Sequence, residues 1–533
     1  MIPKIIHQTW RDHDLPVPES LPESWKRLNP DWEYRFWTDA DLAAFVEREY
    51  PDIWPLFQAS RKPVQKADIA RYLLLHRYGG LYADIDTECV GALDVLADET
   101  RVVLSHEPTE HWGHAEIRGM DMVVFNGVMA SPAGHPFWLD VMQMLHRCRH
   151  AKKDVLVSTG PLMLTGCVAQ YARPEELAIH SCHLFNPQTN GGGISAAKEA
   201  GPLAPARICN HLWQGSWLHK PGLLSRLNAL LRRPKSWAIK QMYFLFRGPY
   251  LTREAAAITL DIPALNAPLP APKAHESIAV FIPVRNAVAH LDRCVELIDQ
   301  LDYPNNRLKL VFCEGDSTDN TFADLLTLAE RHKGQFSEII ITQLATGNRV
   351  NARNRWHPAL QKHRRACIAK VRNHMLKTGL TDGDDWVLWI DVDVCDYPPD
   401  VLSRLLAEQH KIVVPNCVKT PGGSSYDLNS FLDIGTPRDH IYYLFAKGGL
   451  FQPPRSFYWR SHFDDLRFLQ RTPLTGVGGT MLLVHASVHR AGINFPEIPY
   501  DDLLETEGFG KMAVDFGIIP LGLPNLEIIH VDG

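Results

Sequence analysis

Two pairs of aspartates, each pair separated by one residue, follow runs of apolar residues in the chain. Asp84 and Asp86 end the segment 78–86 (YGGLYADID), and Asp391 and Asp393 end the segment 384–393 (DDWVLWIDVD). In an extended strand, side chains two residues apart share a face and lie about 6.5 Å apart. Such carboxylates offer hard oxygen ligands that suit Mg²⁺ or Mn²⁺, and the cation would neutralise charge on a departing phosphate group. A pair of solvated acids at a strand end is the alternative.

Alternating strand-like and helix-like segments surround both pairs, and this alternation predicts an α/β fold with a doubly wound sheet in each half. In the first half we expect strands at 4–7, 34–37 and 80–85 and a helix at about 63–77. In the second half we expect strands at 278–283, 308–313, 386–391 and 412–415, with helices at 291–301 and near Pro399.

The length of 533 residues indicates two or three separately packed units. Residues 262–277 (IPALNAPLPAPKAHES) are rich in Pro and Ala and predict a semi-rigid linker. We therefore place an N-terminal domain at 1–220, a basic helical segment and linker at 221–276, and a C-terminal domain at 277–533. The basic segment would form either an amphipathic helix pair resting on an anionic membrane surface or a helical extension packing one domain on the other. Its basic residues are Arg226, Arg232, Arg233, Lys235, Lys240, Arg247 and Arg253.

Composition restricts the classes of protein further. The chain is 45% hydrophobic and 22% charged with a formal charge of −6, which indicates globular domains and does not favour nucleic-acid binding. Its ten cysteines are scattered without a Cys-x-x-Cys pair and are expected to be reduced core residues. Because neither a signal peptide nor a membrane span is evident, we expect a cytoplasmic protein, with peripheral contact to the inner face of the membrane as a further option.

Several segments of the first half together resemble one known family. They are 2–10 (IPKIIHQTW), 66–72 (KADIARY), 78–86 (YGGLYADID), 158–161 (STGP) and 211–217 (HLWQGSW). Over about residues 1–220 the chain resembles glycosyltransferase family 32, the DXD sugar-transferase group that includes yeast outer-chain mannosyltransferases. The resemblance implies a GT-A fold, a nucleotide-sugar donor and retention of anomeric configuration.

The same resemblance assigns roles to residues of the first half. It implies that Asp84 and Asp86 hold Mn²⁺ or Mg²⁺ and that Asp68 and Arg71 contact the ribose and sugar of the donor. His211 or Ser216 would complete the metal shell, although packing of a loop around the tryptophans is the alternative. Trp10, Ser216 and Trp217 lie in the matching segments and are candidate substrate-binding residues.

Seven segments of the second half occur in an order that resembles another family. They are 312–321 (FCEGDSTDNT), 384–393 (DDWVLWIDVD), 414–417 (VPNC), 426–430 (YDLNS), 477–484 (VGGTMLLV), 505–510 (ETEGFG) and 522–530 (GLPNLEIIH). Across about residues 277–533 the chain looks like glycosyltransferase family 62, the mannan polymerase subunits of the fungal Golgi. The resemblance implies a GDP-mannose donor and α-mannosyl transfer with retention.

A metal site and several substrate contacts follow from this second resemblance and from strand positions. The pair Asp391 and Asp393 would bind the cation, at its Asp393 end, together with His530. Arg285 and Asp316 follow strands and would lie near the nucleotide, because ligands gather beyond the carboxyl ends of parallel strands. Candidates for acceptor activation or for stabilising an oxocarbenium-like transition state are Asp427, Glu505 and Glu507. For Glu507, a helix-start carboxylate interacting with the helix dipole is the alternative.

Taken together, the sequence predicts a bifunctional, metal-dependent, retaining glycosyltransferase with one Mn²⁺ or Mg²⁺ in each domain. Its donors would be GDP-mannose and a further nucleotide sugar such as a UDP-sugar, and its acceptor a glycan or glycolipid. The fusion and the lack of a recognisable anchor suggest a bacterial enzyme of surface polysaccharide synthesis. The alternatives are one active domain beside a non-catalytic carbohydrate-binding scaffold, a scaffold that recruits enzymes to a membrane, and metal-assisted hydrolysis of nucleotide sugars.

Overall fold

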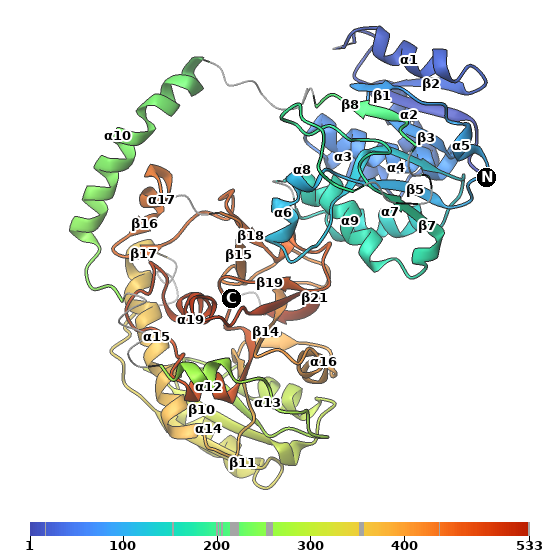
Figure 1. Ribbon diagram of the computed structural model, residues 1–533. Coiled ribbons are helices and arrows are strands. Elements are labelled where there is room, and N and C mark those ends of the chain that lie inside the picture. The colour runs from blue at the N-terminus through green and yellow to red at the C-terminus, as the bar shows by residue number, and fades with distance from the viewer. Residues whose placement is uncertain are drawn as a thin grey trace. The chain divides into compact units, whose positions relative to one another are not determined.

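The computed structural model describes residues 1–15, 17–151, 154–198, 201, 203, 206–213, 223–251, 260–350, 357–435 and 438–530, with only the backbone described for 223–233. The chain divides into two compact units (Figure 1). The N-terminal unit comprises Met1–Pro221 with Asp465–Phe468, and the C-terminal unit comprises Gly222–Asp464 with Leu469–Gly533.

The N-terminal unit is built on a six-stranded sheet in the order β2-β1-β3-β6-β5-β7, beside a two-stranded ribbon of β4 and β8. Its strands are β1 (Ile5–Trp10), β2 (Glu33–Thr38), β3 (Gly80–Ala83), β4 (Thr87–Cys89), β5 (Val102–His106), β6 (Val124–Ser131), β7 (Leu177–His180) and β8 (Cys209–His211). Its α-helices are α1 (Ser20–Leu28), α2 (Asp39–Glu49), α3 (Trp54–Ala59), α4 (Pro63–Tyr78), α5 (Asp94–Ala97), α6 (Gly113–Glu116), α7 (Phe137–Arg147), α8 (Val155–Ser158) and α9 (Pro161–Gln170).

Helix α4 and strand β3 lead directly to the first aspartate pair. Pro63 occupies the first turn of α4, where the missing N–H costs no hydrogen bond. Gly79 and Gly80 then turn the chain sharply with φ angles of +65° and +87°. A Cβ atom on Gly80 would lie 2.4 Å from the carbonyl oxygen of Ile5, so the glycine lets β3 approach β1.

The C-terminal unit is built on a nine-stranded sheet in the order β11-β10-β9-β12-β20-β14-β21-β13, with β19 paired to β21. Its strands are β9 (Ile278–Val284), β10 (Leu308–Glu314), β11 (Glu338–Gln343), β12 (Trp386–Ile390), β13 (Val394–Asp396), β14 (Ile412–Val418), β15 (Phe431–Asp433), β16 (Ala446–Lys447), β17 (Leu450–Phe451), β18 (Arg460–His462), β19 (Thr472–Pro473), β20 (Met481–His485) and β21 (Leu521–His530). Its α-helices are α10 (Leu223–Phe246), α12 (Ile262–Asn266), α13 (Leu291–Asp299), α14 (Thr321–Arg331), α15 (Pro358–Gly379), α16 (Val401–Ala407), α17 (His440–Phe445), α18 (Ala486–Arg490) and α19 (Glu505–Asp515).

Both faces of this second sheet are covered. Alternate residues of β9 belong to different cores: Val280 and Ile282 pack into one apolar cluster, and Ala279 and Phe281 into another. A strand buried on both faces has a continuous apolar sequence, which is why β9 and β12 were predictable. The predicted α/β fold is confirmed in both units.

Both sheets are mixed, because β6 runs antiparallel to β3 and β20 runs antiparallel to β12. Two details of the region between the domains differ from the expectations. The described residues of the basic segment form one helix, α10, which contains Pro234, and not a helix pair. The expected linker begins with helix α12, whose Leu265 is buried against the C-terminal core and whose Pro263 fits the first turn of the helix.

All ten cysteines are free, and all but the half-buried Cys395 are buried. Cys89 and Cys209 face each other as paired residues of β4 and β8. Among the helices that the structure describes, none has the length and apolarity needed to cross a membrane.

Candidate functional site

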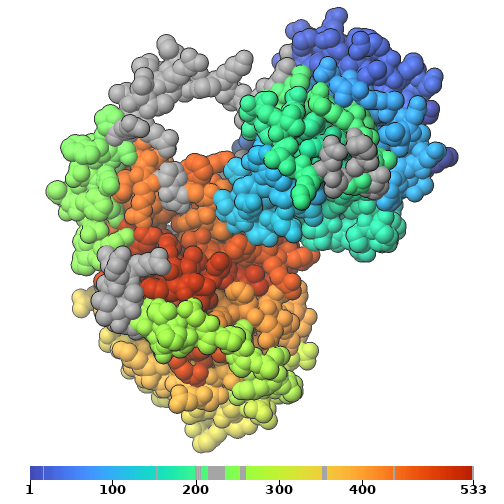
Figure 2. Space-filling model, in the orientation of Figure 1, coloured from blue at the N-terminus to red at the C-terminus, as the bar shows by residue number. Residues whose placement is uncertain are grey.

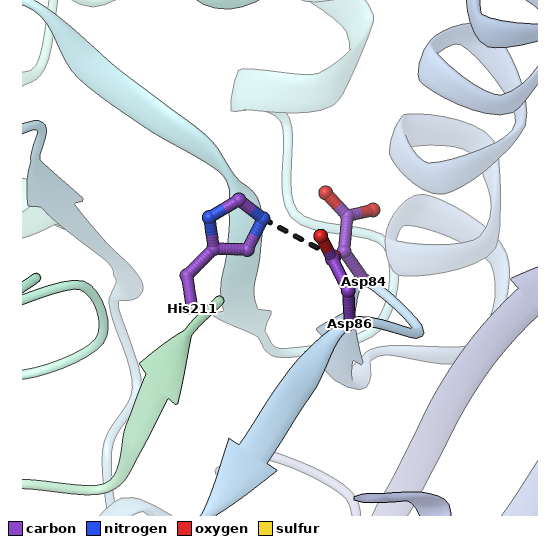
Figure 3. Close-up of side chains that lie close together, drawn as sticks. All are labelled: Asp84, Asp86 and His211. Atoms are coloured by element: carbon purple, nitrogen blue, oxygen red, sulfur yellow. Dashed lines mark ion pairs between the residues drawn. The ribbon is translucent and has the colours of Figure 1, made fainter. Parts of the chain in front are cut away.

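The first candidate site is a group of three side chains in the N-terminal unit. Asp84 and Asp86 lie in the turn between β3 and β4, and His211 ends β8 (Figure 3). One potential ligand atom from each residue lies within 4.8 Å of the others, and Nε2 of His211 is 3.2 Å from Oδ1 of Asp86. Strand β3 ends at Ala83, so the pair occupies a turn and not the expected strand face.

Backbone hydrogen bonds fix this turn on both sides. The amide of Asp84 donates to the carbonyl of Gly127 on β6 (2.8 Å), and the amide of Leu212 donates to the carbonyl of Asp86 (3.1 Å). A Cβ atom on Gly127 would lie 2.8 Å from Oδ2 of Asp84, so a larger residue at this strand position would displace the aspartate side chain. Thr87 and His211 are paired across the ribbon, which places the imidazole beside the second aspartate.

A buried network on α4 holds the first aspartate. Nη2 of Arg71 lies 3.1 Å from Oδ1 of Asp84 and 3.4 Å from Oδ1 of Asp68. Asp68 also accepts hydrogen bonds from Thr159 (2.8 Å) and Asn126 (3.0 Å). The structure therefore brings the predicted donor-binding residues Asp68 and Arg71 next to the aspartate pair.

Burial and charge shift the pKa values of this group. Burial raises the pKa of Asp68 to about 6 and raises that of Asp84, and the guanidinium of Arg71 opposes both shifts. Burial alone would lower the pKa of His211, but the hydrogen bond and the charge of Asp86 raise it above its usual value.

The other candidates of the first half lie in different surroundings. Trp10 packs in a small apolar cluster with Ile85, the residue between the two aspartates, and donates its ring N–H to the carbonyl of Asp14. Ser216 and Trp217 lie outside the described residues, so their expected roles stay predictions. His7 lies within β1, where its ring bonds to the carbonyl of Gly79, and burial lowers its pKa to about 4.

The second candidate site repeats this arrangement in the C-terminal unit. Asp391 and Asp393 lie in the turn between β12 and β13, and His530 ends β21. Nε2 of His530 is 3.1 Å from Oδ1 of Asp393, and Val394 is paired with His530 across the strands. The amide of Asp391 donates to the carbonyl of Thr480 (3.0 Å), just before the antiparallel strand β20.

A buried arginine again contacts the first aspartate. Arg372 of α15 places Nη2 3.2 Å from Oδ1 of Asp391 and Nε 3.2 Å from Oε1 of Glu505. Its Nη1 atom is buried and has no hydrogen-bond partner in the described part of the chain. Two turns earlier on the helix, Arg365 pairs with Glu507 and donates to Oδ1 of Asn429 (2.8 Å). Glu505 and Glu507 thus each pair with an arginine. An interaction of Glu507 with the helix dipole alone would not explain its contact with Arg365.

The second site opens into a cavity of about 620 Å³. Its lining includes the predicted residues Arg285, Asp391, Asp393, Asp427, Glu505 and His530. Asp427 accepts a hydrogen bond from Oγ1 of Thr480 (3.0 Å), and a Cβ atom on Gly478 would collide with it.

Asp316 lies beside the cavity and holds a neighbouring loop. It is absent from the cavity lining and accepts hydrogen bonds from the amides of Thr346 (3.0 Å), Gly347 (3.2 Å) and Asn348 (3.1 Å). Arg285 donates to the carbonyls of Asn348 and Val350. Both residues hold the loop at 346–350 beside the cavity, and a direct contact of Asp316 with nucleotide stays a prediction.

The pKa values of the two aspartates of the second pair shift in opposite directions. Burial raises the pKa of Asp391 to about 7, although Arg372 opposes that shift. Burial would also raise the pKa of Asp393, but the hydrogen bond from His530 holds it below its usual value.

The sequence reasoning missed two residues that the structure places in the sites. Arg372 was not singled out, although each half carries an arginine on the helix that precedes its aspartate strand, and that shared position was the available signal. Trp213 has a φ of +50° and packs edge-on against His211, with ring centroids 4.5 Å apart.

Comparison with protein families gives two matches. The family described as "Glycosyltransferase sugar-binding region containing DXD motif" matches residues 19–103, which include Asp84 and Asp86. The Anp1 family matches residues 257–499, which include Asp391, Asp393 and Asp427. Both resemblances drawn from the sequence are thereby confirmed.

Three of the similar proteins come from one fission yeast. The mannan polymerase II complex anp1 subunit of Schizosaccharomyces pombe is 30% identical over 275 residues, covering 48% of this chain and 64% of that protein. The mannan polymerase complex subunit mnn9 of the same yeast is 30% identical over 253 residues, covering 43% of this chain and 74% of that protein. The inositol phosphoceramide mannosyltransferase 3 of this yeast is 36% identical over 195 residues, covering 35% of this chain and 51% of that protein.

Solved structures that match are glycosyltransferases of low identity. A mannosyltransferase from Pyrobaculum calidifontis in complex with GDP-Man and Mn²⁺ is 17% identical, covers 56% of this chain and 68% of that chain, and has a TM-score of 0.29. The structure of S. aureus TarS in complex with UDP-GlcNAc is 16% identical, covers 48% of this chain and 59% of that chain, and has a TM-score of 0.29. From the family matches and the coverage of the mnn9 subunit, the chain belongs to the Anp1 family through its C-terminal part and joins to it a DXD-containing glycosyltransferase sugar-binding region.

Proposed function

We propose that the chain is a bifunctional glycosyltransferase in which each unit transfers a sugar from a nucleotide sugar, with retention of configuration. The observation that carries this proposal is the recurrence of one arrangement in both units. In each, a buried arginine contacts the first aspartate of the pair and a histidine on a separate strand contacts the second. A unit that only bound carbohydrate would not need the arginine, both aspartates and the histidine together.

The side chains fit a divalent cation. Asp84, Asp86 and His211 combine hard carboxylate oxygens with an imidazole nitrogen inside 4.8 Å, and Asp393 with His530 offers the same donor types. We infer one Mn²⁺ or Mg²⁺ in each unit. When bound, the cation would supply electrostatic stabilisation to the diphosphate of the donor.

The residues of the C-terminal cavity have separate tasks in this proposal. Arg285 stiffens the loop at 346–350, which borders the cavity where we place the nucleotide. Arg372 keeps the carboxylate of Asp391 directed toward the cavity. Asp427 and Glu505 line the same space and would orient the acceptor hydroxyl, whose proton passes to the departing phosphate oxygen.

Donor and acceptor follow from the relatives. We propose GDP-mannose for the C-terminal unit, because it belongs to the Anp1 family of mannan polymerase subunits. The donor of the N-terminal unit would be GDP-mannose or a UDP-sugar. A glycan or glycolipid acceptor agrees with relatives named as mannan polymerase subunits and as an inositol phosphoceramide mannosyltransferase. These relatives are fungal, so a bacterial surface polysaccharide and a cytoplasmic location stay predictions.

The test measures nucleotide release from GDP- and UDP-sugars with Mn²⁺, with and without mannosides and glycolipids as acceptors. The intact chain is compared with Asp84→Ala/Asp86→Ala and with Asp391→Ala/Asp393→Ala. Loss of the cation site should lower the rate of the affected unit by about 100-fold or more. The exposed residues Asp31 and Asp382 provide matched Asp→Ala controls, which should leave both rates unchanged.

Each outcome has one meaning. If each double variant loses one donor or one linkage and keeps the other, both units are transferases. If one pair can be removed without any loss, that unit is a carbohydrate-binding module and the bifunctional proposal is wrong. Sugar release at the full rate without acceptor would indicate a hydrolase.

A further inference from the structure

Helix α10 and its neighbours in sequence have an unusual charge distribution. No Asp or Glu occurs between Glu199 and Glu254, whereas Arg226, Arg232, Arg233, Lys235, Lys240 and Arg247 all lie on α10 or directly after it. The described second half of this helix also carries large apolar side chains. A helix that combines cationic and aromatic residues without any acid is suited to an anionic partner.

One face of α10 fastens the helix to the C-terminal unit. Tyr243 is buried, donates its hydroxyl to the buried Asp502, and packs against Tyr443 with ring centroids 5.2 Å apart. Asp502 also accepts the hydroxyl of Tyr442 of α17 (2.5 Å). Because these contacts fix which side of α10 faces the C-terminal unit, they also determine which side chains face away from it.

The outer face of α10 is apolar and exposed. Trp237, Met242, Leu245 and Phe246 are between 63% and 78% exposed. At about 100° per residue, Leu245 lies on the opposite side of the helix from Tyr243. The neighbouring helix α17 adds the exposed Ile441 and Leu444. Figure 2 shows α10, in green at the left, along the outside of the C-terminal unit. We call these six residues the apolar face.

Basic side chains accompany the apolar side chains of α10. At about 100° per residue, Lys235 lies about 80° from Leu245 around the helix, and Lys240 lies about 140° from it on the other side. Arg247 stacks on Phe244 with its guanidinium carbon 5.1 Å from the ring centroid. Long cationic side chains of this kind can lay their aliphatic parts along a membrane while their charges reach the head groups.

We propose that the apolar face of α10 and α17 docks onto an anionic lipid surface, with α10 lying in the plane of the head groups. Apolar side chains would enter the interface, and Lys235, Lys240 and Arg247 would contact the lipid phosphates. The lack of acidic residues favours lipid over a protein partner, whose surface would carry charges of both signs. The placement is independent of which sugar the two sites transfer.

The experiment is sedimentation of the full chain with vesicles of phosphatidylcholine, with and without phosphatidylserine. We expect binding to the anionic vesicles that weakens as salt is added. Trp237→Ser/Leu245→Ser should lower the affinity about 10- to 100-fold, because two large apolar side chains no longer enter the interface. Lys235→Gln/Lys240→Gln should lower it about tenfold and reduce the salt dependence.

A matched control uses exposed apolar residues far from α10 in sequence. Leu326→Ser/Ile519→Ser changes side chains of 50% and 51% exposure and should leave vesicle binding intact. All these substitutions lie on exposed positions, so circular dichroism should be unchanged. Equal binding to neutral and anionic vesicles, or none to either, overturns the proposal. So does a chain that elutes as a dimer and becomes monomeric in Trp237→Ser/Leu245→Ser without binding vesicles, because a second copy would then cover the apolar face.

Discussion

The two aspartate sites share a backbone plan but differ in how far along the sequence their supports lie. In both, the amide of the first aspartate donates to a carbonyl on or next to the antiparallel neighbour strand, that of Gly127 in one site and of Thr480 in the other. The histidine comes from a later strand. Arg71 takes its second carboxylate from Asp68, three residues earlier on the same helix. Arg372 takes its second carboxylate from Glu505, on α19.

The two sites thus differ in where the arginine finds its second carboxylate. Arg71 finds it on its own helix, although its Nη1 also donates to the carbonyl of Asn126 on β6 (2.8 Å). The arginine of the C-terminal site needs the start of α19, where Glu505 adopts a φ of +55° that costs backbone energy in a non-glycine residue. The C-terminal site should therefore lose its geometry more easily when distant parts of its unit are disturbed.

The largest expected effect comes from removing the buried arginines. Arg71→Ala and Arg372→Ala each leave buried carboxylates without their counter-charge, and we expect each to destabilise its own unit by about 3–5 kcal/mol. Urea unfolding of both variants measures this loss. Arg71→Lys and Arg372→Lys keep the charge and should recover part of it. Equal stability of the alanine variants and the parent would contradict the shared role of the two arginines.

A smaller effect concerns pH and belongs to the N-terminal unit. Burial raises the pKa of Asp68 from 3.8 to about 6, so the folded unit binds this proton more tightly than the unfolded chain. The resulting stability is present below about pH 4 and is lost as the pH rises through about 6. We expect Asp68→Asn to change the pH dependence of the unfolding free energy by about 3 kcal/mol across this window.

The measurement compares parent and variant at each pH, because the difference cancels the other titrating groups. It is made without metal ions. A difference in unfolding free energy that stays constant between pH 4 and pH 6.5 would show that Asp68 does not titrate in that range.

The smallest effect concerns metal affinity. His211→Ala and His530→Ala should each weaken Mn²⁺ binding to one unit by about 10- to 100-fold and leave the other unit unchanged. Titration calorimetry with the intact chain would resolve two sites in the parent. The exposed His13 serves as the control. If one variant weakens both sites equally, the two units do not bind metal independently.

The two aspartate pairs could be located because carboxylate pairs after apolar strands are visible in any sequence. The position of Asp84 and Asp86 in a turn could not, since Ile85 continues the apolar alternation although its side chain packs near Trp10 and outside the sheet. Apolar alternation records burial, and burial alone does not distinguish a strand from the turn that follows it.

Arg372 escaped prediction for a different reason. Helix α15 borders the cavity of the second site, so Gln361 and Arg372 are buried on a face that would be apolar in an ordinary amphipathic helix. The pattern that identifies helices is therefore weakest where a helix contributes to a site. Long-range pairs such as Arg372 with Glu505 leave no local trace in sequence.

The ribbon of β4 and β8 contains its own chemical reporter. Asp86 and His211 lie together at one end of it, and at the other end the free, buried Cys89 is paired with Cys209. A thiol reagent can modify these two cysteines only when the ribbon opens, so their modification rate measures local unfolding of the strands that hold the histidine. Burial raises the pKa of both thiols, which slows the reaction in the closed state further. Ligands that fasten the ribbon would then be detectable by protected thiols, without any turnover.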